Sequence, residues 1–250
     1  MPHLLQPQGE AVLAAALRRS PLLAFDFDGT LARIAPTPAR ARISRSVSGK
    51  LRRLCERLPV AIVTGRSVAD VRGRLDFEPR YVAGNHGAEI GPAQAPGLAG
   101  ELDLARDLLR RHAADLARAG ITLEDKGLSL ALHYRLARCP EQARAVLREV
   151  LQPLHGDYRI FSGRQVENVA PRDAADKRSA VHHLVRQCRA DCAIFIGDDG
   201  NDEPVFASAP AHWLTIRIGR EDPRSRADFF LDSTAEVALL LDRMLAHLGE

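Results

Sequence analysis

Two carboxylates, Asp26 and Asp28, end a short apolar run and are well placed to do chemistry. The run Leu22–Phe25 has the length of a buried strand, and Gly29 and Thr30 after the acids signal a tight turn. In an open α/β sheet, ligands bind at the carboxyl ends of the strands. Two acids there can serve as nucleophile and proton donor, and together they can hold a divalent metal. A capped turn is the alternative, because Asp and Gly are ordinary turn residues.

A second apolar run predicts another strand whose tip suits a phosphate group. Residues Pro59–Arg66 read PVAIVTGR and end in Thr64, Gly65 and Arg66. A hydroxyl, a glycine and backbone amides at a strand tip fit phosphate oxygens. Ser67 is expected to cap the helix that follows. A plain strand-to-helix turn would have the same composition.

The densest group of acids follows a further apolar run, Cys192–Ile196. The segment GDDGNDE begins at Gly197 and contains Asp198, Asp199 and Asp202. Packed carboxylates repel one another, so a positive charge is expected between them, and Mg²⁺ prefers such oxygen ligands. Lys177 supplies a cation at the predicted start of a helix, which Asp176 is expected to cap. A solvated acidic loop is the alternative.

Together these strand tips predict a centre for phosphoryl transfer. Asp26 would attack phosphorus and form an aspartyl-phosphate. Asp28 would protonate the leaving alcohol and then activate water. Mg²⁺, Lys177 and Thr64 would neutralise charge on the transferring oxygens.

The chain pattern predicts a doubly wound parallel α/β core with an inserted α+β unit. Gly91–Gly100 holds two prolines and three glycines and is the best boundary. Residues 102–169 then alternate a helix over 102–116, a hairpin, a helix over 140–151 and a second hairpin, before a parallel pattern returns. The predicted domains are 1–96 with 170–250, and 97–169. The predicted elements of the core include a third strand with a glycine-rich turn over Tyr81–Ile90, edge strands at Trp213–Ile218 and Phe229–Leu231, and a closing helix over 235–248.

Composition narrows the classes of function. The chain has 250 residues, 46% of them hydrophobic, and a net charge of +3, which is too balanced to argue for nucleic acid. Its four cysteines form no C-x-x-C pair and are expected to be reduced. No stretch approaches the roughly 20 apolar residues of a membrane span, and no secretory signal is evident. We therefore expect a cytoplasmic monomer that acts on a small molecule.

The motifs resemble those of the haloacid dehalogenase (HAD) superfamily, in order along the chain. DFDGTL matches the first motif, Thr64 the second, Lys177 the third and GDDGNDE the fourth. The resemblance implies a Rossmann-like HAD core with an inserted cap. It also implies that the Asp26 side chain, the Asp28 main-chain carbonyl and Asp198 ligate Mg²⁺. Gly65, Arg66, Asp199 and Asp202 would support the phosphate site.

A narrower resemblance is to trehalose-6-phosphate phosphatases. NHGAE, LEDKGLSLALHYR and the Pro-Val-Phe after GDDGNDE carry it. It implies that Glu124 and Lys126 in the inserted cap bind the sugar. Glu167 is a third candidate, although its spacing to Lys177 is longer than usual and leaves its register open. His86, in a glycine-rich turn, is a further candidate, for a substrate contact or a positional hydrogen bond.

The resemblance implies a Mg²⁺-dependent phosphatase for trehalose 6-phosphate in trehalose biosynthesis, paired in function with a trehalose-6-phosphate synthase. Other sugar phosphates, such as sucrose phosphate or a glucosyl- or mannosyl-glycerate phosphate, are the alternative substrates. A phosphotransferase or mutase would pass the aspartyl-phosphate to a sugar instead of water. The alternative hypothesis outside enzymes is a non-catalytic phosphosugar-binding module.

Overall fold

The computed structural model describes residues 1–35, 37–90, 93–94, 100–220 and 222–249. Contacts within the chain divide it into a first unit, residues 1–92 with 175–250, and a second unit, residues 93–174. The predicted boundary segment Gly91–Gly100 lies outside the described residues except for 93, 94 and 100. None of the helices in the described ranges has the length and apolar character needed to span a membrane.

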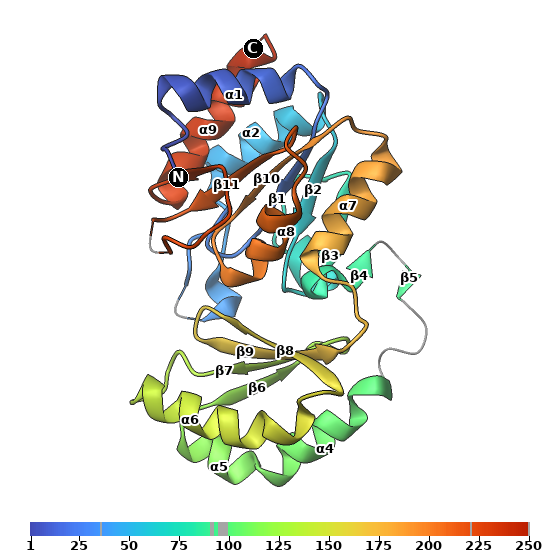
Figure 1. The fold of residues 1–250 in the computed structure, drawn as a ribbon, viewed down its shortest axis with the longest axis vertical. Coiled ribbons are helices and arrows are strands. Elements are labelled where there is room, and N and C mark those ends of the chain that lie inside the picture. The colour runs from blue at the N-terminus through green and yellow to red at the C-terminus, as the bar shows by residue number, and fades with distance from the viewer. Residues whose placement is uncertain (36, 91–92, 95–99, 221, 250) are drawn as a thin grey trace. The chain divides into compact units, whose positions relative to one another are not determined.

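The larger sheet is mostly parallel and runs in the order β12-β11-β10-β1-β2-β3-β4-β5 (Figure 1). Its strands are β1 (Leu22–Phe25), β2 (Val60–Val63), β3 (Tyr81–Gly84), β4 (Glu89–Ile90), β5 (Ala93–Gln94), β10 (Ala193–Gly197), β11 (Leu214–Ile218) and β12 (Phe229–Leu231). β1 is central and pairs in parallel with both β10 and β2. The tips of these three strands therefore meet at one edge of the sheet, as the sequence predicts.

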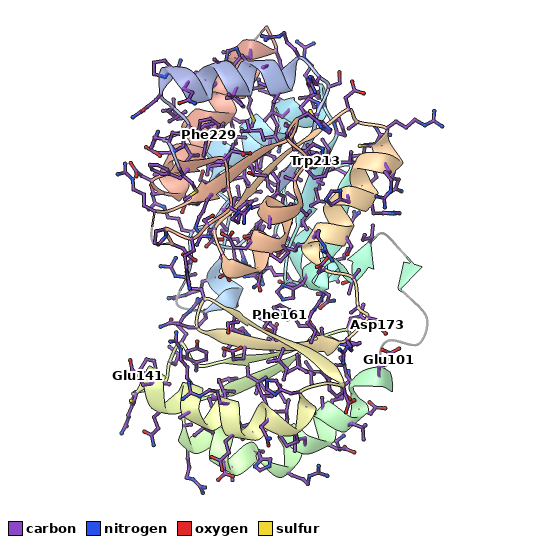
Figure 2. All side chains as sticks on the ribbon, viewed as in Figure 1. Glu101, Glu141, Phe161, Asp173, Trp213 and Phe229 are labelled. Carbon is purple, nitrogen blue, oxygen red and sulfur yellow. The ribbon has the colours of Figure 1, made fainter. Side chains whose placement is uncertain are left out.

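Helices cover both faces of this sheet. They are α1 (Pro7–Leu17), α2 (Arg45–Cys55), α3 (Val68–Arg72), α7 (Lys177–Cys188), α8 (Glu203–Ser208) and α9 (Val237–His247). Leu23 and Phe25 of β1 join the apolar layer of α1, α2 and α9, whereas Leu22 and Ala24 join the layer of α7 and α8. Phe229 belongs to the first layer and Trp213 to the second (Figure 2). β1 is thus apolar on both sides because it is buried on both sides.

The second unit is a four-stranded antiparallel sheet in the order β6-β7-β9-β8, with helices on one face (Figure 1). Its elements are α4 (Asp103–Arg111), α5 (Ala113–Arg118), β6 (Thr122–Asp125), β7 (Leu130–His133), α6 (Pro140–Leu151), β8 (Tyr158–Gly163) and β9 (Val166–Pro171). Leu130, Leu132 and Val169 pack into the apolar layer beneath the helices. The two predicted hairpins and the helix over 140–151 are confirmed.

The glycine-rich turn predicted within Tyr81–Ile90 is confirmed, since β3 ends at Gly84 and Asn85, His86 and Gly87 adopt positive φ values that a strand excludes. Two other predicted elements differ from the structure. The helix predicted over 102–116 is interrupted at His112, which separates α4 from α5. The strand predicted at the sheet edge near Trp213 is interior, since β11 lies between β10 and β12.

Short 3-10 helices complete the described chain, at Pro38–Arg40, Asn85–Gly87, Gly100–Leu102, Gln152–Leu154, Gly200–Asp202 and Thr234–Glu236. The four cysteines are all free thiols.

Candidate active site

The tip of β1 holds Asp26 in a buried position. Its backbone N–H donates to the carbonyl of Ile196 on β10 at 2.8 Å, which continues the parallel ladder to the last residue before the turn. Gly29 closes that turn with φ of +87° and donates its N–H to Ala32 O at 2.7 Å. A Cβ on Gly29 would lie 2.0 Å from Asp198 Oδ2, so glycine is needed here for space as well as for backbone angle.

Lys177 joins the two acidic segments. Asp176 caps the first turn of α7 by accepting from the Ser179 N–H, which places Lys177 at the first helical position. The Lys177 Nζ donates to Asp26 Oδ1 at 2.7 Å and to Asp202 Oδ1 at 2.8 Å, and all three side chains are buried. Burial alone would lower the pKa of Lys177, but the charges of Asp202 and Asp26 raise it above its usual value.

The loop after β10 is organised by Asp202. Its Oδ2 accepts the backbone N–H groups of Asp198 and Asp199, each at 3.0 Å. Asp199 in turn caps the short 3-10 helix Gly200–Asp202 by accepting from the Gly200 N–H. Asp202 therefore fixes the path of the loop that carries Asp198, and Lys177 fixes Asp202.

The site has too much negative charge for its single lysine. Asp26, Asp198 and Asp202 each offer a carboxylate oxygen, and these atoms lie within 4.8 Å of one another. Burial raises the pKa of Asp26 to about 7 in spite of Lys177, and burial together with the charges of Asp26 and Asp202 raises the pKa of Asp198. Within the described part of the chain, Asp198 Oδ1 is buried without a hydrogen-bond partner.

These features fit a divalent cation. A cation with oxygen ligands would satisfy the buried Asp198 Oδ1 and would offset the repulsion that raises both pKa values. Carboxylate oxygens are the ligands that Mg²⁺ prefers in proteins. The predicted ligands Asp26 and Asp198 lie in this cluster, together with Asp202, which the prediction had assigned to phosphate support.

The tip of β2 carries the second predicted segment. Thr64 is buried and its Oγ1 accepts the Arg66 N–H at 3.2 Å. A Cβ on Gly65 would lie 2.4 Å from the His86 ring, so His86 packs directly against this turn. The backbone N–H of His86 donates to Thr64 O at 2.9 Å, which joins the turn after β3 to the end of β2 through the main chain.

Arg66 is directed at a carboxylate. Its Nε and Nη2 donate to the two oxygens of Asp28 at 2.6 and 2.7 Å, and its Nη1 donates to Asp70 Oδ2 at 2.7 Å. The prediction had assigned Arg66 to phosphate support. The contact with Asp28 joins residues far apart in sequence, and no spacing in the sequence indicates it.

Glu89 and Asn85 are structural members of the site that sequence reasoning missed. Glu89 Oε2 accepts the Val68 N–H and the Asn85 Nδ2, each at 2.9 Å. The Asn85 N–H donates to Arg66 O at 2.7 Å. These bonds tie the turn after β3 to the turn after β2. The signal in the sequence that could have indicated this role was the carboxylate of Glu89 in the NHGAE segment.

Glu124 and Lys126 lie close together in the second unit. Glu124 is on β6, and its Oε2 lies 2.8 Å from His133 Nε2 and 3.9 Å from Lys126 Nζ. Its register partner on β7 is Ala131, between the two leucines that face the helices. Glu124 therefore lies on the sheet face opposite the helices.

Glu167 lies on the other face of that sheet. It pairs with Leu132, which packs beneath the helices, and it accepts from Ser162 Oγ at 2.7 Å. It lines a groove of about 490 Å³ with Tyr134 and Arg144. The neighbour of Ala131 on β9 is Asn168, so Asn168 rather than Glu167 shares a face with Glu124. One small ligand on that face would meet Glu124 and not Glu167.

Structural comparison agrees with the fold. A trehalose-6-phosphate phosphatase C-terminal domain from C. albicans has a TM-score of 0.78 at 20% identity, with 98% of each chain covered. The sucrose-phosphatase of Synechocystis sp., in complex with sucrose and phosphate, has a TM-score of 0.60 at 19% identity, with 92% of this chain and 98% of that chain covered. A phosphatase of the HAD superfamily from Bacteroides thetaiotaomicron has a TM-score of 0.61 at 16% identity, with 91% and 94% covered.

Sequence comparison identifies the family. Trehalose-phosphate phosphatases of Mycobacterium tuberculosis and Mycobacterium bovis are 33% identical over 270 aligned residues, which cover all of this chain and 67% of each relative. The chain thus spans about two thirds of the length of these relatives. A family model described as trehalose-phosphatase matches residues 24–234, a range that includes every predicted site residue. The chain is a phosphatase of the HAD fold and belongs to the trehalose-phosphatase family.

Proposed function

We propose that this chain removes the phosphate of trehalose 6-phosphate through an aspartyl-phosphate on Asp26, with Mg²⁺ as cofactor. The observation that carries the proposal is the buried Asp26–Lys177–Asp202 chain at the tip of β1, with contacts of 2.7 and 2.8 Å. A buried carboxylate that is held by a lysine at a sheet edge is a preorganised nucleophile. The family supports trehalose 6-phosphate as the substrate.

The reaction has two steps that share one intermediate. In the first, the Asp26 carboxylate attacks phosphorus, the bond from phosphorus to the sugar oxygen breaks, and Asp28 gives its proton to that oxygen. In the second, Asp28 takes a proton from water, the resulting hydroxide attacks the aspartyl-phosphate, and inorganic phosphate leaves. Asp26 and Asp28 both return to their starting states.

Other residues of the chain stabilise the transferring group. Lys177 neutralises charge beside Asp26, and the Thr64 hydroxyl and the amides of its turn accommodate phosphate oxygens. Asp26, Asp198 and the Asp28 main-chain carbonyl would hold the cation. When bound, Mg²⁺ supplies positive charge that lowers the repulsion between the carboxylates and the phosphate dianion.

The second unit supplies sugar recognition in this proposal. Glu124 lies on the face of the sheet that the unit's own helices do not cover, and Lys126 Nζ lies 3.9 Å from its carboxylate. Charged side chains of this kind can recognise a sugar by hydrogen bonds to its hydroxyl groups. Functional pairing with a trehalose-6-phosphate synthase stays a prediction, as do the monomeric state and the cytoplasmic location.

Phosphate release across a panel of sugar phosphates tests the proposal. The panel contains trehalose 6-phosphate, sucrose 6-phosphate, glucose 6-phosphate and glucosylglycerate phosphate, each with Mg²⁺ and with EDTA. We expect metal-dependent release with a strong preference for trehalose 6-phosphate, and none from Asp26→Asn. Preference for another member would overturn the substrate and keep the core chemistry. Turnover by Asp26→Asn would overturn the mechanism.

A further inference from the structure

The guanidinium of Arg66 binds the Asp28 carboxylate through two parallel hydrogen bonds. Nε donates to Oδ2 at 2.6 Å and Nη2 donates to Oδ1 at 2.7 Å. Two parallel bonds of this kind fix the plane of the carboxylate as well as its position, which a single bond does not. The Asp28 side chain is nevertheless 42% exposed. A carboxylate offers about four lone-pair positions, so positions remain for a proton to or from a reacting group.

Arg66 is itself held in place on three sides. Its Nη1 donates to Asp70 Oδ2 at 2.7 Å, and its guanidinium carbon lies 5.3 Å from the ring centroid of Phe27. Asp70 is also gripped by Arg74, through Nη2 at 2.6 Å and Nε at 3.0 Å. Partial burial would raise the pKa of Asp70, but the hydrogen bonds from Arg74 and Arg66 lower it to about 2. Asp70 is therefore a permanent anion that anchors Arg66.

Arg74 extends this series of ion pairs to the segment that follows β1. Its Nη1 donates to the carbonyl of Ala39 at 3.1 Å. The series Arg74, Asp70, Arg66 and Asp28 thus connects α3 and the loop at Ala39 to the turn that carries the proposed acid and base. Arg66 is buried, which is unusual for arginine unless its charge is fully paired.

We propose that Arg66 is a positioning residue that holds the Asp28 carboxylate in the orientation needed for proton transfer in both steps of the reaction. The inference rests on the proposed role of Asp28 as acid and base. It assigns Arg66 to the proton-transfer side of the site instead of the phosphate. The first step moves one proton from Asp28 to the sugar oxygen, and the second moves one proton from water to Asp28. Both need the same oxygen of Asp28 to face the reacting atoms.

The two parallel hydrogen bonds between Arg66 and Asp28 depend on the planar shape of the guanidinium and not on its charge alone. Lysine carries the same charge as a point and cannot form the two parallel bonds. Arg66→Lys therefore keeps the charge near Asp28 and Asp70 but frees the carboxylate to rotate. A misplacement of about 1 Å in a catalytic group costs on the order of 10²-fold in rate. Asp70→Asn weakens the anchor and should have a smaller effect in the same direction.

The test compares two substrates whose leaving groups differ. Trehalose 6-phosphate releases a sugar alkoxide, which needs a proton from Asp28, whereas 4-nitrophenyl phosphate releases a stable phenolate, which does not. The constant kcat/KM reports steps up to departure of the leaving group. For Arg66→Lys we expect kcat/KM to fall by about 10²-fold on trehalose 6-phosphate and to change little on 4-nitrophenyl phosphate.

A second readout does not depend on the sugar. Hydrolysis of the aspartyl-phosphate needs Asp28 as base with either substrate, so Arg66→Lys should give a rapid burst of 4-nitrophenol followed by slow turnover. Arg72→Gln is the matched control, because Arg72 lies on α3, the helix that follows Arg66, and among the described contacts its side chain pairs only with the exposed Glu78. We expect that variant to match the wild type. Thermal unfolding of each variant checks that it folds.

The outcomes separate this inference from the proposed function. An equal fall in kcat/KM on both substrates without a burst would overturn the positioning role of Arg66 and leave Asp26 as nucleophile. Unchanged kinetics in Arg66→Lys would also overturn it. A wild type that ignores trehalose 6-phosphate would overturn the proposed substrate, and the burst with 4-nitrophenyl phosphate would still decide the role of Arg66.

Discussion

Because Asp26 is buried, its ionisation should lower the free energy of unfolding as the pH rises. A variant that cannot ionise at this position should show the size of that loss. Burial raises the pKa of Asp26 from its ordinary 3.8 to about 7, against the opposing effect of Lys177. The perturbation is Asp26→Asn, which keeps the shape of the side chain but cannot ionise. Wild type and variant are compared across pH in the presence of EDTA, so that no cation favours the charged form.

The sign and size of the effect follow from proton linkage. Between pH 3.8 and about 7 the unfolded chain has lost the Asp26 proton and the folded chain still holds it. The wild type is therefore most favoured relative to the variant below pH 3.8, and that advantage falls as the pH rises through about 7. One pKa unit corresponds to about 1.4 kcal/mol, so the free energy of unfolding should fall by about 4 kcal/mol relative to Asp26→Asn.

Denaturant unfolding measures this difference directly. Free energies of unfolding are obtained for both proteins from about pH 4 to about pH 8, and the variant value is subtracted from the wild-type value at each pH. The subtraction cancels groups that both proteins share. A difference that stays constant within about 1 kcal/mol would refute the reasoning that burial dominates the environment of Asp26. Saturating Mg²⁺ should remove most of the pH dependence, because a metal binds the ionised carboxylate.

Three further predictions concern other parts of the site. Gly29→Ala should push Asp198 aside, since its Cβ would lie 2.0 Å from Oδ2, and calorimetric titration should then show much weaker Mg²⁺ binding. Lys177→Met should leave Asp26 without its buried cation; we expect a loss on the order of 3–5 kcal/mol in denaturant unfolding and loss of phosphate release. Glu124→Ala should lower kcat/KM on trehalose 6-phosphate far more than on 4-nitrophenyl phosphate; equal losses would contradict a role in sugar recognition.

Sequence patterns predicted the parts of the fold that depend on local chemistry. Leu22–Phe25 is continuously apolar and forms the buried strand β1 at those residues. Ser67 and Asp176 were predicted as helix caps, and each accepts a backbone N–H in the first turn of its helix. The meeting of Asp26 with Asp198 followed from the rule that parallel strands end at one edge of a sheet.

What the sequence did not predict depends on contacts between distant segments. The partner of Arg66 lies 38 residues away, and nothing in the TGR segment distinguishes a carboxylate partner from a phosphate. The face of Glu167 depends on register, and a shift of one residue moves every side chain of a strand to the opposite face.

The insertion between the two halves of the first unit also sets the order in which the site is synthesised. Asp26 and Lys177 are separated by 151 residues, and β10, the parallel neighbour of β1, is made later still (Figure 1). At about 5–20 residues per second, the nucleophile leaves the ribosome roughly 8 to 30 seconds before its lysine. During that interval β1 has one unpaired side and the second unit has time to fold. The nascent chain therefore exposes an unpaired, apolar strand edge to which chaperones can bind. This edge is covered only when the last third of the protein supplies β10.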